Sequence, residues 1–212
     1  MALKSILVHV ADDESHCARL NLGLKLARAH GAHLRALFLT QPANMPAAAA
    51  GRAASHSFIQ DLRARAAQKA AALQVWFAER CEAEGLTHDW IVEDGQHLDR
   101  LSHHAHVADL LIASQSPART LEDYVSLSIG ESIALAVGCP TICLPHAWPP
   151  DDQSFAERIL IAWRGDREAV RAVRGAMPLL RTAQSVSVIT IEKPGEDAQP
   201  EDVAAYLARH GV

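Results

Sequence analysis

The densest group of side chains that could bind a metal is a histidine-rich segment near the middle of the chain. It holds His97, His103, His104 and His106, together with Asp94 and Asp99. Residues three or four positions apart share one face of a helix, so pairs such as His103 and His106 could offer ligands to a transition metal. The sequence shows no second anchor for such a site. We therefore expect a solvated helix face here and no bound metal.

A second candidate for chemistry is a pair of serines, Ser114 and Ser116, which follow a predicted strand. Ligands of α/β proteins bind at this end of a strand. A nucleophilic serine also needs a sharp glycine-flanked turn and a nearby base, and neither is evident in the sequence. His9, in the first predicted strand, fits a hydrogen-bonded core residue better than a base. We expect no enzyme activity, and a hydrolase or metal enzyme that uses residues 97–106 is the weakest alternative.

The composition indicates a globular protein. Of its 212 residues, 49% are hydrophobic and 21% charged, and the net charge is −5. Because nucleic acids and anionic membranes require a basic face, we expect the protein to bind neither. The longest apolar runs, such as 110–113, are too short to span a bilayer. Four scattered cysteines without a CxxC pair indicate free thiols in a reducing compartment, and we expect a cytoplasmic protein.

Apolar runs alternate with helical patterns along the first two thirds of the chain. The patterns predict strands at 6–10, 33–39, 88–92, 108–113 and 141–144, and helices at 13–31, 57–84, 97–106 and 121–136. Strands that alternate with helices of this length imply a parallel sheet with helices on both faces. The expected fold class is therefore α/β with a five-stranded parallel sheet.

The chain then begins the same unit again. The strand at 6–10, followed by a helix near Asp13, is echoed by a strand at 158–163 and a helix that starts near Asp166. Internal repetition of this kind indicates duplicated structural units. We predict a first domain at 1–147, a linker at 148–157 and a partial second repeat at 158–212. Since the second copy has too few elements to complete a sheet, we expect either a piece of a longer tandem protein or docking onto the first domain or a partner.

Three segments of the chain carry a family resemblance. Residues 6–14, Ile-Leu-Val-His-Val-Ala-Asp-Asp-Glu, resemble the I-L-V-P-V-D-G-S-E opening of universal stress proteins. Residues 108–112 and 138–145 resemble that family's A-D-L-I-V and C-P-V-L-V-V-P signatures, and 159–167 resembles the A-W-x-G-S opening of the second half of tandem members. The resemblance implies a flavodoxin-like fold of the adenine nucleotide alpha hydrolase type, frequent dimerisation and a role in stress resistance.

Many members of that family bind ATP through a loop of pattern G-x2-G-x9-G-[S/T] after the fourth strand. Its glycines let the backbone amides approach the phosphates. Counted back without gaps from Cys139-Pro140, the glycine positions and the following Ser/Thr position fall on Ser114, Pro117, Leu127 and Ser128. All three glycines are replaced. Proline lacks an amide donor and leucine is bulky, so this loop should not hold phosphates in the usual way.

The family's nucleotide-contacting aspartate near the first strand is also replaced. Its position falls on Ala11, and in the second copy on Arg164. Asp12 and Asp13 follow one and two places later. We interpret them as a helix N-cap and a first-turn carboxylate rather than as displaced ligand contacts. The resemblance therefore implies no ATP cofactor for the first domain.

These observations predict a regulatory or protective protein in stress resistance that acts by binding or interaction, without ATP in its first domain. The alternative is a nucleotide-binding switch whose second repeat holds ATP. The predicted strand Thr141–Leu144 lies at a sheet edge, and an exposed apolar edge needs a partner. We expect this edge to form a homodimer or to pair with the second repeat within the chain.

Overall fold

The computed structural model describes residues 2–40, 56–115, 129–146, 148–152, 154–190 and 200–212. It divides into two compact units, Leu3–Asp151 and Asp152–Val212. The division falls inside the predicted linker, 148–157. None of the helices in the described ranges is long and apolar enough to cross a membrane.

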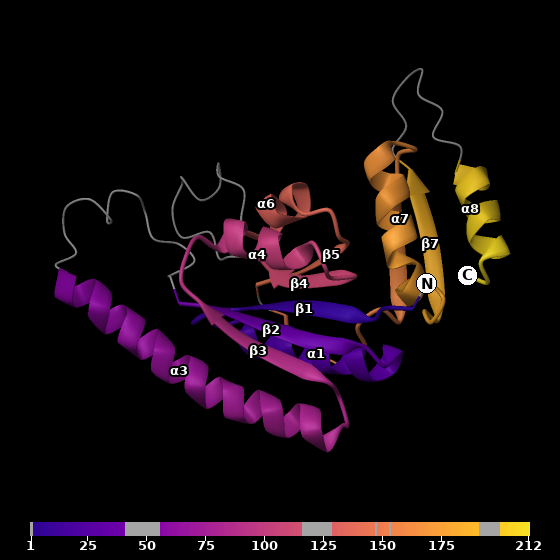
Figure 1. Ribbon diagram of the computed structural model, residues 1–212. Helices are drawn as coiled ribbons and strands as arrows, with labels where there is room; N and C mark the ends of the chain where they lie inside the picture. Colours follow the sequence, from indigo (N-terminus) through magenta and orange to yellow (C-terminus); the bar gives the residue numbers. More distant parts are fainter. Residues whose placement is uncertain (1, 41–55, 116–128, 147, 153, 191–199) are drawn as a thin grey trace. The chain divides into compact units, whose positions relative to one another are not determined.

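The first unit is built on a five-stranded parallel sheet with the order β3-β2-β1-β4-β5 (Figure 1). Its strands are β1 Ser5–Val10, β2 His33–Leu39, β3 His88–Glu93, β4 Leu110–Ser114 and β5 Thr141–Leu144. Every strand pairing in this sheet is parallel. The predicted fold class is confirmed, and the strand bounds differ from the predicted ones by at most two residues.

The helices of this unit cover both faces of the sheet. They are α1 His16–His30, α3 His56–Ala83, α4 His97–Ala105 and α6 Ile129–Ala136. Figure 1 shows α1 and α3 on one face and α4 and α6 on the other. The central strands β1 and β4 are buried almost throughout, which explains their continuous apolar sequences.

Two local contacts fix how the first unit packs. Gly23 lets α1 lie close against the sheet, since a Cβ at this position would stand 2.7 Å from a methyl carbon of Val8 and 3.2 Å from one of Leu34. Asp109 joins the start of β4 to that of β1, because its carboxylate accepts hydrogen bonds from the backbone amides of Lys4 and Ser5 at 2.7 and 2.9 Å. The Asp109 contact fixes the amino ends of β1 and β4, and the parallel pairing of the two strands then places their carboxyl ends at the same edge of the sheet.

The second unit contains two parallel strands and two helices: β6 Arg158–Trp163, α7 Arg167–Leu180, β7 Ser185–Thr190 and α8 Pro200–Arg209. The side chain of Asp166 caps α7 by accepting a hydrogen bond from the Ala169 amide at 2.8 Å. A small core joins the helices to the strands and includes Ile161, Val173, Met177, Leu180, Val203 and Leu207. The order of elements is the one with which the first unit begins.

The helices α3 and α8 end in the same hydrogen-bonded turn. Gly85 and Gly211 both have positive φ, 65° and 78°. The amide of the next residue bonds back to a carbonyl in the last turn, Leu86 to Cys81 at 2.8 Å and Val212 to Leu207 at 3.2 Å. Because both helices end in the same glycine-dependent turn, Gly85 and Gly211 occupy equivalent positions in the two units.

Candidate functional site

A buried arginine organises the carboxyl-terminal edge of the sheet. Arg19 extends from the first turns of α1, and its side chain is 1% exposed. Its Nε donates a hydrogen bond to the backbone carbonyl of His9 at 2.6 Å, and its Nη1 donates to the hydroxyl of Ser114. Its Nη2 donates to both carboxylate oxygens of Asp13, at 2.9 and 2.7 Å. One guanidinium therefore links the ends of β1 and β4 to the loop that follows β1.

Burial makes this network interdependent. A guanidinium removed from water is strongly destabilising unless an anion and hydrogen-bond acceptors replace the lost solvation. Asp13 provides the anion for Arg19, and its own side chain is 31% exposed. The same carboxylate also accepts a hydrogen bond from the Ser15 amide at 2.9 Å. Asp13 is thus committed to contacts within the protein.

The predicted roles of Asp12 and Asp13 as an N-cap and a first-turn carboxylate are wrong. The N-cap of α1 is Ser15, and the first turn of the helix contains no acidic residue. Asp13 instead bonds to the backbone two residues further on, as aspartates in turns commonly do. The carboxylate of Asp12 pairs with the ammonium group of Lys69 on α3.

The remaining family positions give a consistent picture. Ala11 is 2% exposed and offers no polar side-chain atom. Ser114, at the first glycine position, is 6% exposed and has its hydroxyl bound by Arg19. Pro117, Leu127 and Ser128 lie outside the described residues. Among the described positions, those that the resemblance relates to the nucleotide are apolar or already bonded within the protein.

His9 is a buried, hydrogen-bonded core residue, as predicted. It is 3% exposed, and its Nε2 lies 2.9 Å from Nδ1 of His97. Burial lowers the pKa of His9 well below its ordinary value, and the nearby charges of Arg19 and His97 lower it further. His9 is therefore neutral at physiological pH.

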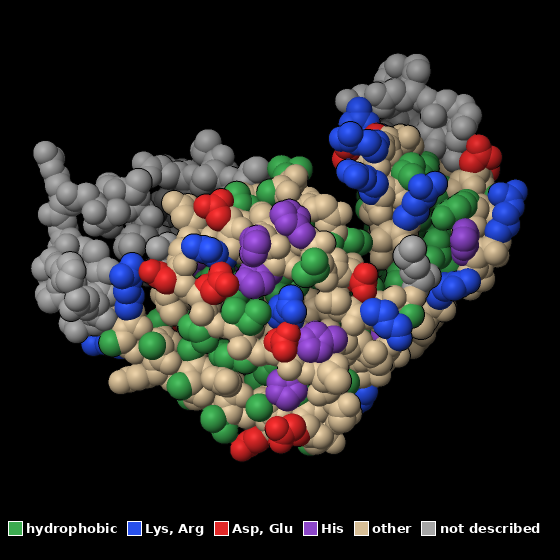
Figure 2. Space-filling model, in the orientation of Figure 1, with side chains coloured by type: hydrophobic (Ala, Val, Ile, Leu, Met, Phe, Trp, Pro, Cys, Tyr) green, Lys and Arg blue, Asp and Glu red, His purple; other side chains and the backbone are tan. Residues whose placement is uncertain are grey.

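The predicted solvated helix face holds only for part of the histidine segment. His103 and His106 are exposed, and Figure 2 shows histidines gathered on the surface over α4. His97, however, is buried against His9, which corrects the prediction for this residue. His104 pairs with Glu93 at 3.0 Å between Nε2 and Oε1. Within the described residues, no group of three side chains is arranged to hold a metal ion.

Two acidic residues that precede this helix, Glu93 and Asp94, also have partners. Asp94 pairs with Arg63 of α3 at 3.0 Å and accepts a hydrogen bond from the Thr40 hydroxyl at 3.0 Å. Oε2 of Glu93 lies 3.8 Å from Nε of Arg100. These ion pairs lie where β2 and β3 end and where α4 begins, and they account for the polar sequence of this region.

The strand proposed for partner binding lies at the sheet edge. β5 is the last strand in the order and pairs with β4, from Leu111 with Thr141 to Ser114 with Leu144. The segment after β5 is held against α1, because the Ser15 hydroxyl donates to the His146 carbonyl at 3.1 Å.

Comparison with known proteins extends these observations. The model of the universal stress protein family matches residues 2–145. No curated protein matches the sequence. Among solved structures, a universal stress protein from Archaeoglobus fulgidus is 14% identical, with a TM-score of 0.72, and the match covers 98% of this chain and 72% of that one. A putative universal stress protein from Pseudomonas aeruginosa is 17% identical, with a TM-score of 0.57 and coverage of 99% and 68%.

Proposed function

Since the chain belongs to the universal stress protein family, we propose that the unit Leu3–Asp151 acts in stress resistance as a binding or interaction module. It does so without binding ATP in the mode usual for the family, and without enzyme activity. The observation that carries this proposal is the buried network of Arg19, which engages the side chains at the edge where a nucleotide would be recognised.

The residues that follow β1 support this proposal. Ala11 stands where the family resemblance places a nucleotide-contacting aspartate, and its methyl group cannot accept a hydrogen bond. Asp13 is the acidic partner of Arg19, and diverting it to a ligand would leave a buried guanidinium without its anion. Because the Asp13 side chain is 31% exposed, breaking this ion pair costs about 2–3 kcal/mol, less than for a fully buried pair. A nucleotide would have to offset this cost before it gained any affinity.

Ser114 supports the proposal independently of the carboxylates. A glycine at this position would let backbone amides approach a phosphate, whereas Ser114 presents a hydroxyl fixed by Arg19. The positive charge of Arg19 is itself neutralised by Asp13 at 2.7 Å. It is therefore not available as a free cation for phosphate.

Titration calorimetry of Mg-ATP into the full 212-residue chain tests the proposal, with an ATP-binding universal stress protein as positive control. We expect no binding heat from this chain under conditions that saturate the control. Binding that Asp13→Asn abolishes and Arg164→Ala leaves unchanged would overturn the proposal. The reverse pattern would assign ATP to the unit Asp152–Val212, which is the alternative function inferred from the sequence.

For the interaction itself, we propose that the edge strand β5 pairs with a second copy of the chain or with a second repeat. The position of β5 at the end of the strand order supports this proposal. Sedimentation of Ile142→Lys, with Val92→Lys on the opposite edge strand β3 as matched control, tests it. We expect only Ile142→Lys to convert dimers to monomers, and equal sedimentation of both variants and the parent chain would contradict dimerisation through β5.

A further inference from the structure

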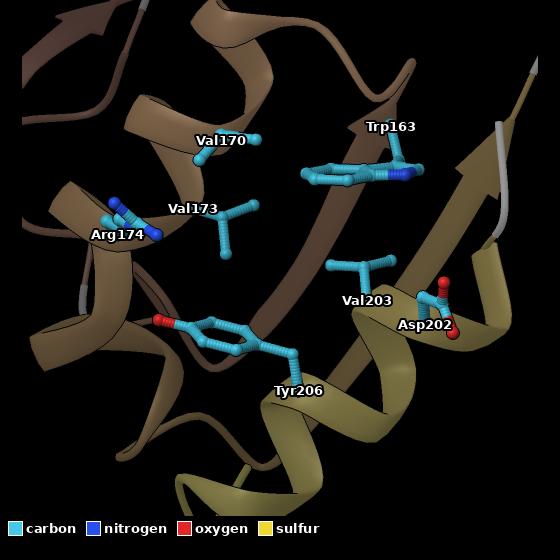
Figure 3. Close-up of a pocket in the computed structure, with 7 residues that line it drawn as sticks. All are labelled: Trp163, Val170, Val173, Arg174, Asp202, Val203 and Tyr206. Atoms are coloured by element: carbon cyan, nitrogen blue, oxygen red, sulfur yellow. The ribbon is translucent and has the colours of Figure 1, made fainter.

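The second unit contains a cavity of about 210 Å³ between α7 and α8, beside the end of β6. Figure 3 shows Trp163 and Tyr206 at opposite ends of this cavity. Three valines complete the apolar lining, Val170 and Val173 from α7 and Val203 from α8. The walls are therefore mainly apolar, with an aromatic ring at each end.

Over the described residues, α8 and α3 differ in length. α3 has 28 residues and α8 has 10. When the two helices are aligned by Gly85 and Gly211, Pro200 corresponds to Gln74. The part of α3 before Gln74, which buries Ala66 and Ala70, has no helical counterpart in the described part of the second unit.

The last residues of the corresponding strands β1 and β6 also differ in size and burial. In the first unit Val10, the last residue of β1, is completely buried. The corresponding last residue of β6 is Trp163, a much larger side chain that is only partly buried and lines the cavity. An indole ring that lines a cavity can stack against a planar molecule bound there.

Two oppositely charged side chains lie at the rim. Arg174 comes from α7 and Asp202 from α8, and Figure 3 shows them on opposite sides of the cavity. Both are exposed, and within the described residues neither forms an ion pair. The hydroxyl of Tyr206 points towards the side of Arg174 (Figure 3). A cation and a hydroxyl on one side suit an anion, and the carboxylate on the other side suits a hydrogen-bond donor.

We propose that this cavity binds a small planar aromatic carboxylate, with its ring system between Trp163 and Tyr206 and its carboxylate at Arg174. A hydroxyl or amino group at the opposite end of the ligand is directed towards Asp202. The volume of about 210 Å³ is below the range of about 300–1,000 Å³ for sites of drug-sized ligands, so one or two rings are appropriate. A triphosphate is disfavoured, because it would meet one arginine and the negative charge of Asp202.

Binding of 6-hydroxy-2-naphthoate to the full chain, measured by calorimetry and amide NMR shifts, tests this proposal. We expect saturable binding, with shifts centred on Trp163 and Tyr206. Arg174→Gln should weaken binding about tenfold, since it removes a charge-assisted hydrogen bond. The matched control is Arg171→Gln, an exposed arginine on the same helix that does not line the cavity, and it should leave the affinity unchanged.

A second probe, 2-naphthol, separates charge recognition from apolar adsorption. It lacks the carboxylate, so it should bind more weakly than the naphthoate and with equal affinity to the parent chain and to Arg174→Gln. Equal binding of the naphthoate to the parent and Arg174→Gln would overturn the proposal. Shifts centred away from the cavity, or no binding at millimolar probe, would overturn it as well. Circular dichroism of each variant confirms that it is folded.

Discussion

Replacing Asp13 by asparagine is the sharpest test of the Arg19 network. The substitution keeps the shape of the side chain and one acceptor oxygen but removes the negative charge opposite a guanidinium that is 1% exposed. Loss of one partner of a fully buried pair destabilises by about 3–5 kcal/mol. Because the Asp13 side chain is 31% exposed, solvent screening reduces this, and we expect about 2–3 kcal/mol.

The neighbouring residue provides a matched control. Asp12→Asn removes an ion pair with Lys69 in which the two side chains are 54% and 33% exposed. Exposed pairs contribute about 0–1 kcal/mol, so this variant should be almost as stable as the parent. The two variants make the same chemical change at adjacent positions and differ mainly in what the carboxylate neutralises.

Urea unfolding followed by tryptophan fluorescence measures the difference. Trp76 and Trp90 report on the first unit, to which Asp13 belongs. In a double-mutant cycle with Arg19→Met, the double variant should be less destabilised than the sum of the single variants, since no unpaired charge remains. The reasoning is refuted if Asp13→Asn destabilises no more than Asp12→Asn, or if the cycle shows no coupling.

Three further predictions concern other parts of the first unit. The folded-state pKa of His9 is lowered from 6.5, so below about pH 6.5 the unfolded chain binds a proton that the folded chain does not. The free energy of unfolding should therefore fall with decreasing pH, by at most about 1.4 kcal/mol per pH unit. In a plot of the urea unfolding midpoint against pH, His9→Gln should have a flatter slope than the parent chain in this range. Gly23→Ala should destabilise the protein by about 1–3 kcal/mol through overpacking. Gly138→Ala should leave stability unchanged, because a Cβ at this position meets nothing within 4 Å. Thermal unfolding of the two variants measures the difference. Burial raises the pKa of the Cys81 thiol to about 11. A thiol reagent at pH 8 should therefore label the exposed Cys17 rapidly and Cys81 only when the protein unfolds. Equal labelling rates of the two cysteines would contradict the packing of α3.

The fold could be predicted because its central strands are buried on both faces. The apolar runs that became β1 and β4 have no polar alternation, and this pattern is typical of a parallel sheet. The positions of the helix starts were harder to infer. Asp13 was predicted as part of the first helix, yet α1 begins only at His16, because the Asp13 side chain stabilises a turn instead.

The Arg19 network was missed although the sequence carries a signal for it. Arg19 lies three and seven residues before Leu22 and Leu26, so it belongs to the same helix face as these two buried leucines. His97 likewise lies four and eight residues before Leu101 and Ala105, on the buried face of α4. A charged or polar residue in a buried helical stripe indicates an internal partner, but the sequence alone does not identify that partner, which comes from a distant strand end.

The network also explains how this sheet edge remains ordered without the family's glycine loop. Polar groups at the carboxyl ends of β1 and β4 need hydrogen-bond partners when they are buried. Here Arg19 satisfies the His9 carbonyl and the Ser114 hydroxyl from within the protein, and Asp13 balances its charge. A ligand that approached these two groups would therefore have to displace existing hydrogen bonds. This physical difference is why we place ligand recognition in the second unit, where an aromatic cavity has charged groups at its rim that form no ion pair within the described residues.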